Sequence, residues 1–526
     1  MNELISSKLK LGNDFIKQNK IEEAKNIFQE IIEIDPKIHQ AYKFLSIIEF
    51  QKKNFIESLK YLDKSLKFNK NSSDLYSIKG LILIKLNKKD EALKAFSESI
   101  KYDPKNINSL LNLGVIFKEN LNFIKSLESF NQIIKFDDKH YVAYTYKAYV
   151  QIELNKFSES IISLNKAISI KEDYFNAYLV RGNSFMALNE FKKSLKDYDF
   201  IINNKSSCEE KIYFEALFNK GLLLLMNEKY YDGWEHYEYR FRAKNITKPL
   251  YLKDIPFLKN LSDLKKKSLL IHAEQGIGDN IQFIRYIFLI KKYCPDISFL
   301  VNKKLCKILE ESELGIKIIS SINENTNYDF HCPIMSLPYK LSNYINQIPY
   351  ADSYINIKEE RILKWRKIFS KQKFNIGINW TASLNSQLDK GRSIPLENFR
   401  NISLLNDVNL FSLQKNPGDN VKLLKQMNIH NFEKLDENHT FIDTAPIIKN
   451  LDLIITCDTS IAHLAGSLGK KTFLILQKNS EWRWLREKNV TPWYKSIKIF
   501  RQRIQDEWKE PFKEIELEIK NSFSRK

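Results

Sequence analysis

A loop in the second half of the chain carries residues that could bind an anion or handle a proton. The apolar segment 268–272 runs into a loop with two glycines and two carboxylates: Glu274, Gln275, Gly276, Ile277, Gly278 and Asp279. We expect a strand at 268–272 and a helix that begins near Asn280. Glycines at such a turn let the backbone approach a ligand, and a helix N-terminus favours an anion. Asp279 either caps the helix or, as a cap, also faces a ligand cleft.

A second polar loop follows the apolar segment "FNIGIN" and ends in two cations. Its polar residues are Trp380, Thr381, Ser383 and Asn385, and its cations are Lys390 and Arg392. Pro395 follows them, at a point where a helix could start. The guanidinium offers fork geometry and the ammonium a point charge, so the pair suits a diphosphate. A solvated basic loop is the alternative interpretation in a chain so rich in Lys.

The stretch "LDLIITCDTSIAHLAGSLGK" places a polar turn between two apolar segments. We expect a strand at 451–456, a turn at 458–460, and a helix over 461–468 that stops at Gly469. Small residues let this helix pack closely on a sheet, so that its first turn points into the crevice where phosphates or a ribose bind. The predicted ligand contacts are Asp458, Thr459, Ser460 and His463, although His463 could instead be an ordinary helix-surface histidine.

Short apolar strands alternate with amphipathic helices from about residue 265 to the end of the chain. This alternation predicts parallel sheets with right-handed crossovers, that is, doubly wound α/β domains. Two such blocks predict a pair of Rossmann-like lobes that face one cleft, at 265–360 and 361–526. The segment "EWRWLREKNVTPWY" follows the last main strand, "KTFLIL", of the second block. Its Trp482, Arg483, Trp484 and Trp493 could wall a pocket or pack the lobes together.

The first half of the chain repeats with a period of 34 residues. Small residues recur at this spacing in several columns, including Ala24, Ser58, Ala92, Ser126, Ser160 and Ser194, and Gly80, Gly114, Ala148 and Gly182. Such columns predict antiparallel helix pairs that cross closely at the small residues. The pattern resembles the tetratricopeptide repeat, with about six units in an α-solenoid over 1–240 and a capping or linker segment over 241–264. Trp234, Tyr237 and Tyr239 are expected to cap the array as core residues.

Composition narrows the possible classes of protein. The net charge of +19 is compatible with nucleic acid or acidic substrates, but it spreads along a Lys-rich chain without a nucleic-acid-binding motif, so no nucleic acid is expected. Five cysteines without metal-ligand spacing predict neither a disulfide framework nor a zinc site. No leader and no transmembrane segment is recognisable, so we expect a soluble cytoplasmic protein.

Five segments together resemble a known family: "HAEQGIGDNIQFIRY", "GRSIPL", "FSLQ", "FIDTAPIIKNLDLIITCDTSIAHLAGSLGK" and "EWRWLREKNVTPWYKSIKIFRQ". They look like the glycosyltransferase domain joined to tetratricopeptide repeats in many bacterial proteins. That domain is similar to the heptosyltransferase group, glycosyltransferase family 9, which has the GT-B fold. The Asp-Thr-x-x-x-His-Leu-Ala match from Asp458 to Ala465 is its most specific element.

The resemblance implies roles for individual residues. Asp279 matches the candidate base of the heptosyltransferases, Arg392 falls near their phosphate-binding Lys, and 458–463 match their donor-binding turn. Glu274, Gln275, Gly276, Gly278, Trp380 and Trp482 are further candidates for the cleft. Two features depart from the group: it usually has Gly where Ser460 stands, and the Glu274–Gln275 pair is not part of its motif.

The resulting hypothesis is a glycosyltransferase that uses a nucleotide-diphosphate sugar, with repeats that bind a protein or peptide in their groove. The resemblance implies an inverting reaction without a metal or other cofactor. The sequence agrees in having its one Asp-x-Asp, at 197–199, inside the repeats. The alternative is a non-catalytic adaptor whose α/β part is a degenerate glycosyltransferase-like domain.

Overall fold

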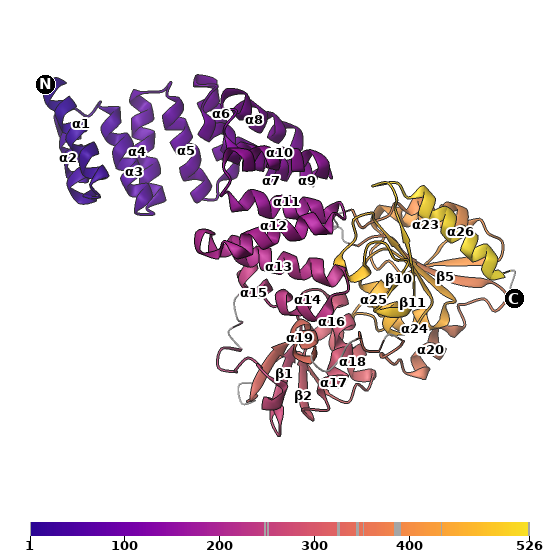
Figure 1. Cartoon of the computed structure of the whole chain (residues 1–526). Helices are drawn as coiled ribbons and strands as arrows, with labels where there is room; N and C mark the ends of the chain where they lie inside the picture. Colours follow the sequence, from indigo (N-terminus) through magenta and orange to yellow (C-terminus); the bar gives the residue numbers. More distant parts are fainter. Residues whose placement is uncertain are drawn as a thin grey trace. The chain divides into compact units, whose positions relative to one another are not determined.

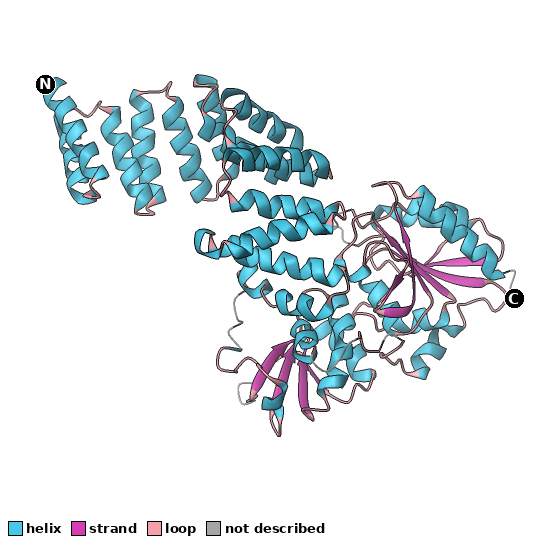
Figure 2. Ribbon diagram, in the orientation of Figure 1, coloured by secondary structure: helices cyan, strands magenta, loops and turns pink. Residues whose placement is uncertain are grey.

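The computed structural model describes residues 2–246, 249, 252–322, 327–342, 347–350, 352–382, 391–432 and 434–523. The chain divides into two compact units, Met1–Asn204 and Lys205–Lys526. Figure 1 shows helices throughout the first unit, and Figure 2 shows the strands of the second gathered in separate sheets. A helical solenoid followed by α/β structure is thus confirmed.

Helices in antiparallel pairs make up the first unit. In order these are α1 (Asn2–Lys17), α2 (Ile21–Ile34), α3 (His39–Gln51), α4 (Phe55–Phe68), α5 (Ser73–Lys85), α6 (Lys89–Tyr102), α7 (Ile107–Glu119), α8 (Phe123–Phe136), α9 (Tyr141–Glu153), α10 (Phe157–Ile170), α11 (Phe175–Ala187) and α12 (Phe191–Asn203). Each helix packs on the next one along the chain. The tight turn inside several pairs is made by an Asn with positive φ, as at Asn87 and Asn155.

The glycine column explains how each pair closes. A Cβ added to Gly80 would come within 2.5 Å of the Phe96 ring, and one added to Gly114 within 2.6 Å of Phe130. In each case the aromatic ring of the second helix lies against the glycine of the first. The predicted close crossing at small residues is confirmed, and at these glycines the partner is an aromatic ring.

Buried serines form a second regular feature of the helix pairs. Ser58 Oγ donates to the carbonyl of Ser46 at 2.8 Å, Ser126 to that of Gly114 at 2.7 Å, and Ser194 to that of Gly182 at 2.8 Å. Serine therefore replaces alanine in this column without leaving a buried hydroxyl unpaired. The bond ties the second helix to the backbone of the first.

Three helices open the second unit: α13 (Glu210–Met226), α14 (Tyr230–Tyr237) and α15 (Arg240–Ala243). α13 and α14 pack on each other as a further antiparallel pair. Trp234 and Tyr237 are buried, as expected of core residues. The helical region therefore continues to Ala243, although its last pair belongs to the second compact unit, which begins at Lys205.

The first lobe of the second unit is a parallel sheet in the order β3-β2-β1-β4 with its helices. The strands are β1 (Ser268–His272), β2 (Asp296–Leu300), β3 (Lys317–Ile319) and β4 (Phe330–Pro333). The connections are α16 (Ile277–Phe283), α17 (Ile287–Ile290), α18 (Lys303–Glu311) and α19 (Leu337–Leu341). The strand order reverses between β1 and β4, which makes a topological switch point there.

The second lobe is a larger sheet in the order β10-β11-β9-β8-β5-β6-β7. Its strands are β5 (Phe374–Asn379), β6 (Val408–Ser412), β7 (His430–Asn431), β8 (Leu453–Thr456), β9 (Thr472–Leu476), β10 (Val490–Thr491) and β11 (Tyr494–Arg501). All pairings are parallel except that of β10 with β11. Without β10 this is the order of a doubly wound Rossmann sheet, and its switch point lies between β5 and β8.

Helices cover the second sheet and complete its core. They are α20 (Glu359–Arg366), α22 (Arg400–Ser403), α23 (Val421–Gln426), α24 (Thr444–Asn450), α25 (Ser460–Ser467) and α26 (Lys509–Phe523). The C-terminal α26 packs into this core, where the rings of Phe512 and Phe399 meet edge to face at 4.9 Å. The helix stop at Gly469 is confirmed, since its φ of +68° favours glycine.

We predict that Gly80→Ala destabilises the first unit by about 1–3 kcal/mol, because the new methyl meets the buried Phe96 ring. Thermal melting followed by far-UV circular dichroism measures the change. Lys85→Ala, at the exposed end of the same helix, is the matched control and should leave the first transition unchanged. Equal melting of G80A and wild type would contradict this account of the helix crossing.

Candidate functional site

Polar side chains converge at the switch point of the second lobe. Asn379, the last residue of β5, donates to Gln414 Oε1 at 2.7 Å and accepts from Thr459 Oγ1 at 2.9 Å. Thr456 Oγ1, at the end of β8, donates to the same Asn379 oxygen at 3.2 Å. Thr459 also caps α25, since its hydroxyl accepts the N–H of Ile461 at 3.2 Å. The predicted turn is therefore held by side chains from three strand ends.

Asp458 lies in this turn and is 8% exposed. Burial raises the pKa of its carboxyl to about 6, and the charge of Glu481 adds to the rise. Arg392 and Arg483 lower the pKa but do not cancel the effect of burial. Arg392 also donates to the backbone oxygen of Asp458 at 3.4 Å. The structure thus brings together two predicted residues from different loops; Lys390, the other predicted cation, lies outside the described residues.

Arg483 joins the two lobes at the centre of the site. Its guanidinium is buried and donates to Asp279 of α16, to Glu481 at 2.6 Å and to Gln282 at 3.1 Å. Asp279 and Glu481 neutralise the charge and raise its pKa against the effect of burial. Arg483 was predicted to wall a pocket or to pack the lobes together, and these bonds give it the second role.

Asp279 lies inside the first turn of α16, not before it. The helix begins at Ile277 with Gly276 as its N-cap, so the expectation of a start near Asn280 is wrong by one turn. The Asp279 carboxylate accepts the N–H of Gly276 at 2.9 Å and pairs with Arg483. The structure therefore bears out the capping interpretation, and the same carboxylate faces the second lobe.

His463 is buried where α16 and α25 meet. A Cβ on Gly278 would lie 2.7 Å from its ring and 3.4 Å from the Cα of Ser460, so the two helix starts touch. Its Nδ1 lies 3.0 Å from the hydroxyl of Tyr494, and its ring stacks on Trp484 at 5.1 Å. Burial, with Arg483 next, lowers its pKa to about 3. The alternative of an ordinary helix-surface histidine is wrong, because the ring is buried, and a neutral ring can meet an anion only as a hydrogen-bond donor.

Arg240 of α15 fills the switch point of the first lobe. Its side chain is 0% exposed and donates to both carboxylate oxygens of Glu274, at 2.7 and 2.8 Å. It also donates to Glu238 at 2.6 Å and to Ser336 Oγ at 2.8 Å. Glu274 follows β1 and Ser336 follows β4, so this cation occupies the crevice where an α/β sheet usually binds its ligand. No motif in the sequence indicated Arg240.

The remaining predicted cleft residues are engaged in packing. Gln275 donates to the Tyr237 hydroxyl at 2.9 Å, and Trp482 meets the rings of Trp234 at 5.5 Å and Trp493 at 6.0 Å. Trp380 is 2% exposed in the core of the second lobe, a different location from the expected cleft. The rings of Trp234, Trp482 and Trp493 hold α14 and the 482–493 segment together.

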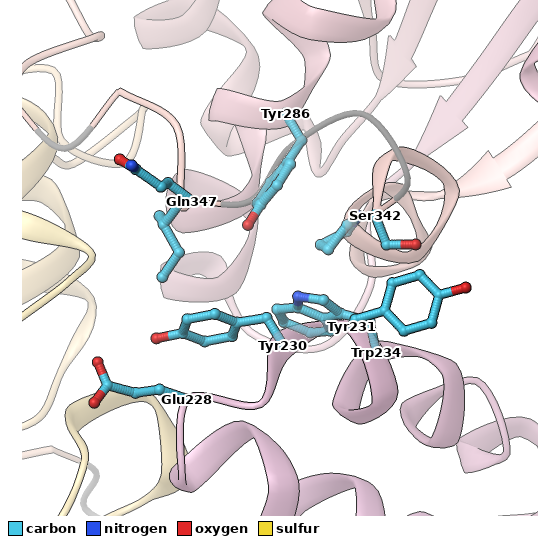
Figure 3. A pocket seen from close by; sticks show the side chains of 9 residues that line it. Glu228, Tyr230, Tyr231, Trp234, Tyr286, Ser342 and Gln347 are labelled. Carbon is cyan, nitrogen blue, oxygen red and sulfur yellow. The ribbon is translucent and has the colours of Figure 1, made fainter.

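A separate pocket of about 180 Å³ lies between α14 and the first lobe. Figure 3 shows the rings of Tyr230, Tyr231, Trp234 and Tyr286 around it, with Glu228 and Gln347 at its edge. Burial raises the pKa of Tyr230 well above its usual range, and its hydroxyl has no partner among the described residues. No pattern in the sequence indicates this pocket, because its residues come from three distant segments.

Two kinds of feature are not found among the described residues. Within them, no group of three or more His, Cys, Asp or Glu side chains is arranged to hold a metal ion. No helix among them has the length and apolar character needed to cross a membrane.

Comparison with known proteins identifies the repeats. Residues 9–73, 73–106 and 141–174 match models described as tetratricopeptide repeat. The protein FlbA of Caulobacter vibrioides is 22% identical over 310 residues, which cover 54% of this chain. The match spans about half of that relative, 51% of its length. The predicted tetratricopeptide repeats are thereby confirmed.

Several solved structures are similar to part of this chain. YrrB, described as a tetratricopeptide protein with an unusual peptide-binding site, is 19% identical with a TM-score of 0.29, over 32% of this chain and 88% of its own. PilW, described as a type IV pilus biogenesis factor, is 16% identical with a TM-score of 0.37, over 40% and 97%. A tetratricopeptide protein from Parabacteroides merdae is 13% identical with a TM-score of 0.38, over 47% and 95%.

We predict that Arg240→Met destabilises the second unit by about 3–5 kcal/mol, because it leaves the Glu274 carboxylate buried without its cation. Tryptophan fluorescence during urea unfolding reports on this region. The double variant R240M/E274Q should recover part of the loss. Arg242→Met, at an exposed neighbouring position, is the control. A loss no larger than that of R242M would refute the role given to the buried pair.

A pH dependence follows from the buried carboxyl of Asp458. Its pKa rises from 3.8 to about 6 on folding, so the folded protein takes up a proton in this range and loses stability as pH rises from about 4 to about 6. The Asp458→Asn variant has no carboxyl at this position, so its stability does not fall for this reason. The stability of D458N relative to wild type should therefore increase across that window, by a few kcal/mol at most, since one pKa unit is worth about 1.4 kcal/mol.

Thermal melting between pH 4 and pH 7 measures this difference. Glu481, Arg392, Arg483 and Arg501 act on Asp458 in the wild type and are retained in the variant, so their own titration largely cancels. Asp419→Asn, at an exposed position of the same lobe, should show a flat difference. A flat difference for D458N as well would show that Asp458 titrates normally.

Proposed function

We propose that the second unit is a glycosyltransferase of the GT-B type, which transfers a sugar from a nucleotide-diphosphate sugar to an acceptor hydroxyl. The supporting observation is the polar turn at the switch point of the second lobe, where Arg392 meets Asp458 beside the capped start of α25. Free N–H groups at a helix start and a guanidinium are suited to the diphosphate of a donor. The resemblance to glycosyltransferase family 9 supplies the reaction.

In the proposed reaction the acceptor oxygen attacks the anomeric carbon, and the bond from that carbon to the diphosphate oxygen breaks. A carboxylate takes the proton of the acceptor hydroxyl, and the diphosphate leaves with the bonding electrons. Arg392 and the N–H groups at the start of α25 stabilise the charge that develops on the leaving group. No metal is required in this scheme.

Asp279 is the proposed base, from its match to the family. Arg483 holds it at the surface that faces the second lobe, and its other oxygen accepts the Gly276 N–H. The bond to Arg483 keeps the side chain in position but also occupies the oxygen that would otherwise be open to the acceptor hydroxyl. Catalysis by Asp279 therefore involves loosening of the Arg483 contact when substrates bind.

The first unit is proposed to recruit a protein or peptide partner, as is usual for such arrays. The adaptor alternative has an observation in its favour: Arg240 occupies the switch point of the first lobe, and Arg483 neutralises Asp279. In that case the second unit has no chemistry and the repeats carry the function.

A thermal-shift screen against nucleoside diphosphates and nucleotide sugars separates the two proposals. At least one nucleotide sugar should raise the melting temperature of the wild type. Arg392→Ala should weaken its binding about tenfold or more, while Arg400→Ala, an exposed arginine in the same segment, should bind as the wild type does. Asp279→Asn should bind the donor normally and lose turnover by at least about a hundredfold.

Absence of any shift for the wild type would exclude the enzyme and leave the adaptor. Equal binding by R392A and wild type would show that Arg392 does not bind the phosphates of the donor. Full turnover by D279N with any active donor would remove Asp279 as the base.

A further inference from the structure

Two arginines lie at the carboxyl edge of the second sheet, next to the turn of Asp458. Arg501 is the last residue of β11 and is in register with Leu476, the last residue of β9. Arg486 belongs to the segment that follows β9. β9 lies between β11 and β8, the strand that leads to Asp458. Both guanidiniums are therefore at the edge where parallel sheets bind their ligands.

Neutral groups hold both side chains in position. Arg501 donates to the hydroxyl of Ser480 and to the backbone oxygens of Trp484, at 2.6 Å, and Leu485, at 2.8 Å. Arg486 donates to the side chain of the adjacent Asn479 at 3.0 Å. These acceptors are consecutive residues, and the two guanidiniums are close enough for the charge of Arg486 to act on Arg501.

No carboxylate pairs directly with either of these charges among the described residues. Both Nε atoms are buried without a hydrogen-bond acceptor in the described part of the chain. Burial lowers the pKa of each guanidinium to about 10, and the charge of Arg486 further lowers that of Arg501. Asp458 acts on Arg501 in the opposite direction. Partly buried, adjacent like charges are costly unless an anion accompanies them.

The backbone next to the two arginines is strained at Leu485, whose oxygen bonds to Arg501. Leu485 has a φ of 57° and a ψ of −177°, a conformation that side chains other than glycine rarely adopt. This conformation directs the Leu485 oxygen toward Arg501 and carries the chain on to Arg486. The segment is therefore shaped around the two guanidiniums.

We propose that Arg486 and Arg501 form an oxyanion site that binds a phosphate group, in addition to the contact from Arg392. The guanidinium donors that have no acceptor among the described residues suit the oxygens of a phosphate. The inference rests on the proposed function only in assigning this phosphate to a nucleotide sugar; free inorganic phosphates have the same chemistry. A donor bound here extends from Asp458 across the end of β9 to β11.

Isothermal titration calorimetry on the full chain tests the site. The ligands are inorganic pyrophosphate and, in separate titrations, the nucleoside diphosphates. We expect pyrophosphate to bind the wild type more weakly as salt increases. Arg486→Gln should weaken binding about tenfold or more, as should Arg501→Lys, which keeps the charge but loses the fork. Arg503→Gln, whose side chain is exposed and paired with Glu510 and Glu514, is the control.

R486Q is the decisive variant. Among the described residues, Arg486 donates a hydrogen bond only to the side chain of Asn479, so its replacement spares the bonds from Arg501 to the backbone. Melting temperatures within about 2 °C of the wild type establish that each variant is folded. Equal pyrophosphate binding by wild type and R486Q overturns the site.

Failure of this inference is distinguishable from failure of the proposed function. If nucleotide sugars bind the wild type and R486Q equally, the oxyanion site is wrong while the glycosyltransferase stands. If pyrophosphate binding depends on both arginines while no nucleotide sugar binds or turns over, the site stands and the glycosyltransferase is wrong.

Discussion

The buried guanidinium of Arg483 must be neutralised, and much of the second unit is organised by this requirement. One partner, Asp279, comes from the first turn of a helix in the first lobe, and the other, Glu481, from the segment after β9 in the second. Removing a cation from water costs several kcal/mol, so the two carboxylates have to stay close to it. The helix starts of α16 and α25 are consequently held together, and they can touch because position 278 has no side chain.

A second buried arginine applies the same constraint to the first lobe. Arg240 reaches Glu274 and Ser336 at the ends of β1 and β4, so α15 is fixed to the sheet by charge and by hydrogen bonds. The two switch points of the unit therefore differ. That of the first lobe is filled by the chain itself, whereas that of the second presents hydroxyls, an amide and the carboxyl of Asp458. This difference is why the proposed donor contacts lie on the second lobe.

The first unit depends mainly on packing. Its repeats set a glycine of one helix against an aromatic ring of the next, and its serines bond to backbone oxygens across the same interface. Period and small-residue columns were readable from the sequence because each repeat interacts mainly with its neighbours. In the α/β part the alternation of strands and helices was equally readable, and the parallel sheets follow it. The site was harder to predict from the sequence. No motif indicated Arg240, Asn379 or Gln414, and Trp380 was expected in a cleft but lies in a core.

The sequence by itself determined the local elements: the period of 34 residues, the strand-to-helix turns and the helix stop at Gly469. These depend on interactions between residues close in the chain, and such interactions are encoded by spacing and residue type. Only the tertiary structure decided the partners of the charged groups. Asp279 and Arg483 are 204 residues apart, and Arg240 and Glu274 are 34 apart. A long-range pair forms because burial makes an unpaired charge costly, and which residues share a buried space is not known until the chain has folded.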